Sequence, residues 1–365
     1  MKKIRNSVLC GLLAFALAAC GSGVENSGGD AAATAGETSA ATENKAVNVI
    51  LVDGAPLLGM TNMMSDEFAG IDGYDISYTM TNDLDALVAS LLNQEPDFAI
   101  APVNIAAMMN NNGSGYRLAA VTVWGLMHIV SDQDVSTLQD LKGETIVAFG
   151  RGGVPGITLR SVLKQNNIDF IEPNDLSFTP EPDKVSIVYL TAAGDVRDAI
   201  ATGMEIGGKP AAFGLLAEPV ATAISGFANN SGRPGFTAKI NLQTEWARNN
   251  NGEIYPQAAL IFHERLLTEN ADFVNEFISA VEQSSAYANG NPEKAGDLAV
   301  TLGSSAIPNG LIISNAYEAG RLPIDFAYAN DAKNAVNSFL QIIMEESPNL
   351  IGGKMPPDSF YYDKE

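Results

Sequence analysis

A glycine-rich turn is the stretch of this sequence whose residue types best suit the binding of a small molecule. It runs from Gly150 to Gly156, between an apolar run and an amphipathic pattern. Glycines let a ligand approach the backbone closely, and the amides at the start of a helix attract anions. We therefore expect Gly152, Gly153 and Val154 to contact a ligand. A purely structural turn is the alternative, because the pattern is neither a Walker loop nor a dinucleotide fingerprint.

Three larger side chains would set the chemistry of that ligand. Arg151 would balance an acidic ligand, with a solvated side chain as the alternative. Trp124 would stack on a flat ligand or pack at a hinge. Glu218 disfavours a purely anionic ligand and favours one with an N–H donor. The glycine turn and Arg151 thus favour an acid such as a sulfonate, whereas Trp124, Glu218 and nearby methionines slightly favour a neutral or nitrogen-bearing ring.

The remaining ligand-binding candidates lie where predicted strands give way to helices. Gly54, Ala55 and Pro56 follow the first strand, and Asn104 follows a later one. Asn104 and Glu218 each begin a predicted helix, so a helix cap is the alternative role for both. A cap whose second polar atom faces the ligand would still orient it.

Catalytic and metal-ligating patterns are missing from the sequence. His128 and His263 are the only histidines, and each falls in a predicted strand among apolar neighbours. Cys10 and Cys20 are the only cysteines, and both belong to the N-terminal segment. No Gly-x-Ser-x-Gly motif occurs, and His263-Glu264 lacks the second histidine of a zinc helix. We therefore expect a binding protein that is not an enzyme, with no metal and no cofactor.

Five strand–turn–helix junctions would position these residues. In the central junction, Phe98–Ala101 is an apolar strand buried on both faces, Pro102 ends it, and Asn104 caps the next helix. The others span Val49–Leu57, Thr145–Gly156, Val185–Asp195 and Ala211–Glu218. In an open α/β sheet such junctions lie at the carboxyl ends of strands, where ligands bind. The predicted fold class is α/β, with two mostly parallel sheets facing one another across a cleft.

One long apolar run divides the body into two lobes. Leu118–Val130 carries Gly125 near its middle, as expected of a strand that leaves one domain and enters another. We predict a first lobe of residues 46–123 plus 264–365 and a second lobe of residues 124–263. Asn82 would cap an amphipathic helix of the first lobe, and the helical patterns of the C-terminal part face the core of that lobe, which makes it discontinuous in sequence.

The N-terminus is typical of a targeting segment. Residues 1–20 combine a basic start, a short apolar core and Leu17-Ala-Ala before Cys20. The apolar core is shorter than the roughly 20 residues that span a bilayer. The segment resembles a bacterial lipoprotein signal, which implies a lipid such as palmitate on Cys20; an ordinary cleaved signal peptide is the alternative. Residues 21–45 are small and polar, so we expect a flexible tether.

The charge of the chain excludes some partners. The formal net charge is −22, and it becomes −25 once the three basic residues of the signal are removed. Such an acidic body disfavours nucleic acid and anionic membrane surfaces as partners.

Taken in order, the motifs resemble those of substrate-binding proteins of ABC importers. The group is the nitrate/sulfonate/taurine one, which is related to binders of thiamine pyrimidine precursors. The matching stretches are Leu17–Cys20, Asp53–Pro56, Asp97–Asn104, Trp124-Gly125, Leu138–Gly143, Phe149–Pro155, Glu218-Pro219 and Ile351–Tyr362.

The resemblance implies a two-lobed periplasmic-binding-protein fold of type II, whose cleft closes on a small solute. Its partners would be an ABC permease and ATPase, and the chain would be a monomer held by its lipid on the outer face of a bacterial membrane. A lipid-anchored receptor for signalling is an alternative. An enzyme of thiamine-pyrimidine synthesis on the same fold is another, although the cysteine cluster of that branch is absent here.

Overall fold

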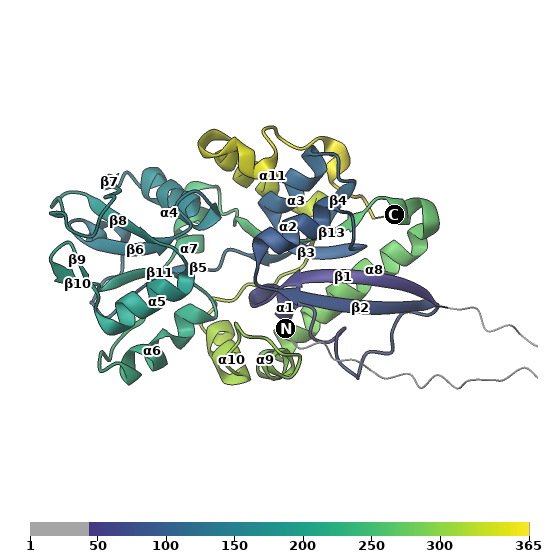
Figure 1. Ribbon diagram of the computed structural model, residues 1–365, viewed down its shortest axis with the longest axis horizontal. Helices are drawn as coiled ribbons and strands as arrows, with labels where there is room; N and C mark the ends of the chain where they lie inside the picture. The colour runs from purple at the N-terminus through teal and green to yellow at the C-terminus, as the bar shows by residue number, and fades with distance from the viewer. Residues whose placement is uncertain (1–43, 365) are drawn as a thin grey trace, which may run out of the picture. The chain divides into compact units, whose positions relative to one another are not determined.

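The computed structural model describes residues 44–364, which form two six-stranded sheets with their helices (Figure 1). The predicted signal, the predicted lipidation site Cys20 and most of the predicted tether lie outside the described residues. Within the described part of the chain, no helix is both long and apolar enough to cross a membrane.

The first sheet mixes strands from distant parts of the chain. Strands β2, β1 and β3 run parallel, and β13 lies antiparallel between β3 and β4. A β-branched and apolar composition suits strands that are buried on both faces. In sheet order the strands are β14 (Ala327–Tyr328), β4 (Tyr116–Trp124), β13 (Pro256–His263), β3 (Phe98–Pro102), β1 (Lys45–Val52) and β2 (Tyr74–Thr81).

The second sheet is built from one continuous segment. Strands β11, β6, β8 and β7 run parallel, whereas β5 is antiparallel to both of its neighbours. The sheet order is β12 (Thr237–Asn241), β5 (Met127–Ser131), β11 (Phe213–Ala217), β6 (Thr145–Phe149), β8 (Val185–Leu190) and β7 (Phe170–Ile171). A separate two-stranded ribbon pairs β9 (Glu205–Ile206) with β10 (Lys209–Pro210).

Helices cover both faces of each sheet. Alternate residues of β3 enter different cores: Ala99 packs in the same cluster as Phe339 of α11, whereas Phe98 stacks on Phe277 of α8. On the second sheet, α4 and α7 cover one face, and α5 and α6 cover the other (Figure 1). The helices are α1 (Ala55–Leu58), α2 (Leu84–Leu92), α3 (Val103–Asn111), α4 (Val154–Gln165), α5 (Ala193–Thr202), α6 (Val220–Asn230), α7 (Leu242–Asn249), α8 (Arg265–Gly290), α9 (Pro292–Thr301), α10 (Gly310–Glu318) and α11 (Ala329–Glu346).

The chain passes from the first sheet to the second through Gly125 and Leu126. The amide of Gly125 donates to Tyr255 O at 3.0 Å, and a Cβ at this position would come within 2.3 Å of the Tyr255 ring. Glycine is therefore required where the two connecting segments touch. The division into two lobes remains our proposal, and because β13 belongs to the first sheet, we place the return crossing at residues 250–255.

Three predicted helix starts are wrong by one or two residues. Asp83, not Asn82, caps α2, since its carboxylate accepts hydrogen bonds from the amides of Asp85 and Ala86. Asn104 does not cap α3, because the helix already begins at Val103. Pro219 is the N-cap of α6, and the first helical residue is Val220. Helices α7 and α10 were not predicted.

Candidate functional site

Most of the candidate residues lie in or next to turns that follow parallel strands of the two sheets. Gly54 follows β1, the glycine-rich turn follows β6, and Glu218 follows β11. Strand β5, which is antiparallel to β11, begins at this same end of the second sheet. The turns therefore mark one edge of each sheet, and the crossing at Gly125 joins the two edges.

Asp53 fixes the first turn, although the sequence analysis did not choose it as a site residue. Its carboxylate accepts hydrogen bonds from the amides of Gly54 at 2.7 Å, Ser305 at 2.8 Å and Ala306 at 3.2 Å. The hydroxyl of Ser304 donates to the same group at 2.5 Å. Burial alone would raise the pKa of Asp53, but these hydrogen bonds lower it below its usual range. The loop after α9 is thereby held over the end of β1.

That loop also limits what Gly54, Ala55 and Pro56 can present to a ligand. Gly54 has a φ of 102°, which favours glycine, and a Cβ there would lie 3.6 Å from the Cβ of Ala306. Ala55 is buried. Pro56 is half-buried in the first turn of α1. Of the three, Pro56 has the most exposed side chain.

The glycine-rich turn closes on itself. Gly150 O accepts from the amide of Gly153 at 2.9 Å and from that of Gly156 at 3.1 Å. A Cβ on Gly156 would come within 2.5 Å of Gly150 O, whereas Gly152 has no atom within 4 Å of its Cβ position. Helix α4 begins at Val154 with Gly153 as its cap. Gly156 is thus needed for the turn itself, whereas the Cβ position of Gly152 is open and that of Gly153 is only in ordinary van der Waals contact.

Arg151 is already paired in this structure. Its guanidinium bonds to the carboxylate of Glu172 at 3.2 Å and to Asn174 Oδ1 at 3.1 Å, and it lies over the ring of Tyr189. The side chain is 46 % exposed. Its charge is therefore balanced by a neighbouring acid, and a solute would have to compete with Glu172 for it.

A second arginine, which the sequence analysis did not identify, extends this network. Arg160 of α4 donates to Glu172 Oε1 and to the hydroxyl of Tyr189. It also forms an ion pair with Glu346 of α11 at 2.9 Å. Burial raises the pKa of Tyr189, so its hydroxyl stays protonated. Arg160 thereby joins the helix after the glycine turn to a helix of the first sheet.

Glu218 forms another ion pair between elements of the two sheets. Its carboxylate is fully buried and accepts from the amide and hydroxyl of Thr222, so it also caps α6 from outside the helix. Arg321 Nε, from the segment between α10 and β14, donates to Glu218 Oε1 at 2.8 Å. Because all these partners are protein groups, Glu218 is fixed in place and is not a free carboxylate.

Trp124 and Asn104 pack against other parts of the chain. Trp124 is 7 % exposed, and its indole N–H donates to Asp325 O at 2.8 Å. The buried Asn104 donates to Leu350 O at 3.3 Å. These contacts agree with hinge packing for Trp124 and with a structural role for Asn104 within α3.

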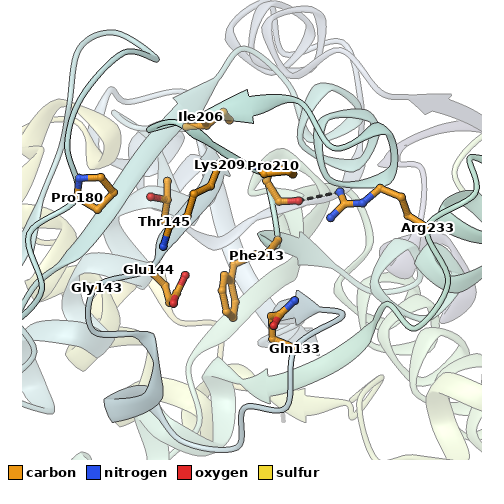
Figure 2. Close-up of a pocket in the computed structure, with 12 residues that line it drawn as sticks. Gln133, Gly143, Glu144, Thr145, Pro180, Ile206, Lys209, Pro210, Phe213 and Arg233 are labelled. Carbon is orange, nitrogen blue, oxygen red and sulfur yellow. Dashed lines mark hydrogen bonds between the residues drawn. The ribbon is translucent and has the colours of Figure 1, made fainter.

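A separate cavity of about 360 Å³ lies at the opposite edge of the second sheet (Figure 2). Its lining includes Thr145 and Phe213, the first residues of β6 and β11. Lys209, Glu144 and Arg233 add charge, but Arg233 is held by Ala211 O at 2.8 Å. None of the predicted ligand residues lines this cavity. In residues 44–364, no cluster of three or more histidine, cysteine or acidic side chains is placed to hold a metal.

The family described as NMT1/THI5-like matches residues 71–295 of the sequence. This range covers the second sheet and four strands of the first, β2, β3, β4 and β13. The chain belongs to the NMT1/THI5-like family. A search of curated proteins finds no match.

Solved structures similar to this NMT1/THI5-like chain confirm the predicted fold. An ABC transporter protein from Parabacteroides distasonis is 20 % identical, with a TM-score of 0.68 over 88 % of this chain and 100 % of that one. The periplasmic aliphatic sulphonate binding protein SsuA of Escherichia coli is 14 % identical, with a TM-score of 0.62 over 88 % and 93 %. A Candida albicans protein described as having the generic periplasmic binding protein fold is 12 % identical, with a TM-score of 0.52 over 84 % and 93 %. The chain therefore has the periplasmic-binding-protein fold.

Proposed function

We propose that this protein is the solute-binding component of an ABC importer, which captures a small organic solute and delivers it to a membrane permease. Its membership of the NMT1/THI5-like family, together with the periplasmic-binding-protein fold, carries the proposal. The structural relatives include a sulphonate binding protein and an ABC transporter protein. No observation favours a signalling receptor or an enzyme.

Solute capture would use the edges of the two sheets that the crossing joins. In this mechanism the open protein exposes both edges, the solute contacts each, and its higher affinity for the closed form stabilises that form. We propose contacts from Pro56 on the first sheet and from Gly152, Gly153 and Val154 on the second. Four other residues would hold these contacting residues in position without touching the solute themselves: Gly54, Ala55, Trp124 and Glu218.

The proposed location is the cell envelope. A lipid on Cys20 would anchor the chain to the outer face of the membrane, and the tether of residues 21–45 would give the body reach. We propose a monomer, whose membrane partners are the permease and the ATPase that acts through it.

Mass spectrometry of gently purified protein tests both parts of this proposal. Native and then denaturing spectra of the body should reveal a small molecule that is released on unfolding. If the protein is empty, a thermal-shift screen of sulfonates, pyrimidines and flavins should stabilise it. A protein that carries no solute and responds to none of these compounds contradicts solute binding. The intact mass of the membrane-extracted chain tests the anchor, since an unmodified Cys20 in the mature chain would contradict it.

A further inference from the structure

His128 is the second residue of β5, at the edge of the second sheet where the candidate turns lie. It pairs with Leu216 of β11 on one side and with Asn241 of β12 on the other. Leu216 lies two residues before Glu218, and Asn241 caps α7. His128 therefore lies at the crossing side of the sheet, beside the segment that leads to Gly125.

The hydrogen bond of its inner nitrogen defines the tautomer of His128. Nδ1 lies 2.9 Å from Leu126 O, and a carbonyl oxygen only accepts, so Nδ1 carries the proton. Nε2 then presents a lone pair. Burial lowers the pKa of His128, an effect that Glu218 opposes and Arg321 reinforces, so the ring is neutral at pH 7.

The outer nitrogen of His128 has no hydrogen-bond partner among residues 44–364, although it is buried and the residue is only 1 % exposed. Buried polar atoms are almost always satisfied by protein, water or a ligand. The neighbouring acid does not satisfy this one. The Glu218 carboxylate is near enough to raise the pKa of His128, but its hydrogen bonds go to Thr222 and Arg321, and the Glu218 amide donates to Leu126 O at 3.1 Å.

We propose that His128 is a ligand-contacting residue whose Nε2 accepts a hydrogen bond from the solute, which must therefore carry an N–H or O–H donor. The inference rests on the solute-binding function proposed above and selects between its two solute classes. A sulfonate or nitrate anion has no donor and would leave the lone pair unmatched, at the cost of an unsatisfied buried acceptor. An amino-substituted ring supplies the donor.

This nitrogen is buried in the present structure, so in the proposed mechanism opening at the crossing would have to give the solute access to it. His128 is two residues beyond Leu126, so a change in the angle between the sheets moves the backbone next to the imidazole first. The bond from Nδ1 to Leu126 O would couple the ring to the backbone of the crossing. His128 would thus contact the solute and also lie beside the backbone that moves on closure.

Thermal-shift and calorimetric binding with two compound sets test the proposal. One set contains aminopyrimidines and amidines, and the other contains alkanesulfonates and nitrate. The donor-bearing set should supply the ligands. His128→Phe should weaken their affinity by about ten-fold or more, because it removes the acceptor while keeping a ring of similar size. His128→Gln should restore much of the affinity, since its amide oxygen reaches the position of Nε2.

His263→Phe is the matched control. His263 is the other histidine, its Nε2 is also buried without a partner in the described residues, and it lies at the far end of β13 beside Asp97. This variant should bind as the wild type does. Binding confined to the donor-free anions, or equal affinity in His128→Phe, overturns the inference and leaves solute binding intact. A response to neither set, with no co-purified solute, contradicts the proposed function itself.

Discussion

At the scale of single residues, Asp53 holds the first turn of the candidate site in place. Asp53→Asn replaces one acceptor oxygen by an amide that faces donors from the loop after α9. Hydrogen bonds to a charged group contribute about 1.5–3 kcal/mol, so we expect the free energy of unfolding to fall by roughly 2 kcal/mol at pH 7. Urea denaturation measures this loss.

The effect of Asp53 should depend on pH in a defined direction. The pKa of Asp53 in the folded protein lies below its ordinary value of 3.8, so its stabilisation is present above that pH. It is lost as the pH falls through the folded pKa. The difference between wild type and Asp53→Asn should therefore stay constant from pH 7 to about 4 and shrink below. Asp75→Asn is the control, because Asp75 is exposed and accepts one hydrogen bond, from Asn44. Equal losses in both variants would contradict the role assigned to Asp53.

The role of a residue was predictable where it depends on its neighbours in the sequence. It was not predictable where it depends on a partner that is distant in the sequence. The need for glycine at Gly54 and Gly156 follows from local turns. The pairing of Arg151 was not predictable, since its acid, Glu172, is 21 residues away and on another strand end. Arg321 lies 103 residues from Glu218 in a segment with no periodic pattern. Only the fold brings such pairs together.

At the scale of elements, the glycine-rich turn contains one glycine with a proposed binding role, Gly153, and one with a structural role, Gly156. Gly153 has a φ of −118°, which any residue adopts, and its Cβ position lies 3.7 Å from Gly150 O. Gly153→Leu should therefore fold normally and place a side chain where we expect the solute. We predict at least a ten-fold loss of solute affinity with an unchanged melting temperature, measured by calorimetry and circular dichroism.

Gly156→Ala is the complementary variant in the same turn. Its Cβ would meet Gly150 O at 2.5 Å, so the turn or the start of α4 must shift. Overpacking of this kind costs about 1–3 kcal/mol, which should appear as a lower melting temperature. Solute binding that is unaffected by Gly153→Leu would remove this turn from the site.

The elements themselves were largely predictable, because their patterns are local. All five strand–turn–helix junctions are present, and the apolar run around Gly125 is indeed two strands in two sheets. The error at Asn82 arises because asparagine and aspartate cap helices equally well, so composition does not choose between Asn82 and Asp83. The error at Asn104 has another cause, since α3 begins directly after Pro102 without a polar side chain as its cap. Helix α10 lacks a distinct apolar stripe: Leu311 is 58 % exposed while Gly310 is buried.

At the scale of the whole molecule, ion pairs join the elements of the two sheets. Arg321→Met would leave the buried carboxylate of Glu218 without its cation. Breaking a buried pair costs about 3–5 kcal/mol, and because Arg321 is partly exposed we expect about 2–3 kcal/mol from urea denaturation. Lys294→Met removes the exposed pair with Glu67 and should cost less than about 1 kcal/mol. If the free energy of unfolding falls by a similar amount in the two variants, the Glu218–Arg321 pair contributes no more to stability than an exposed ion pair.

The position of β13 has a consequence for how the protein is made. This strand lies between β3 and β4 in the middle of the first sheet, yet it is synthesised only after the whole second sheet. Until residue 263 has emerged, β3 and β4 have unpaired edges that invite association with other chains. The second sheet can pair all of its strands by residue 241, so it should mature first. A nascent chain from which residues up to about 250 have emerged should thus contain a folded second sheet and an incomplete first sheet that needs a chaperone.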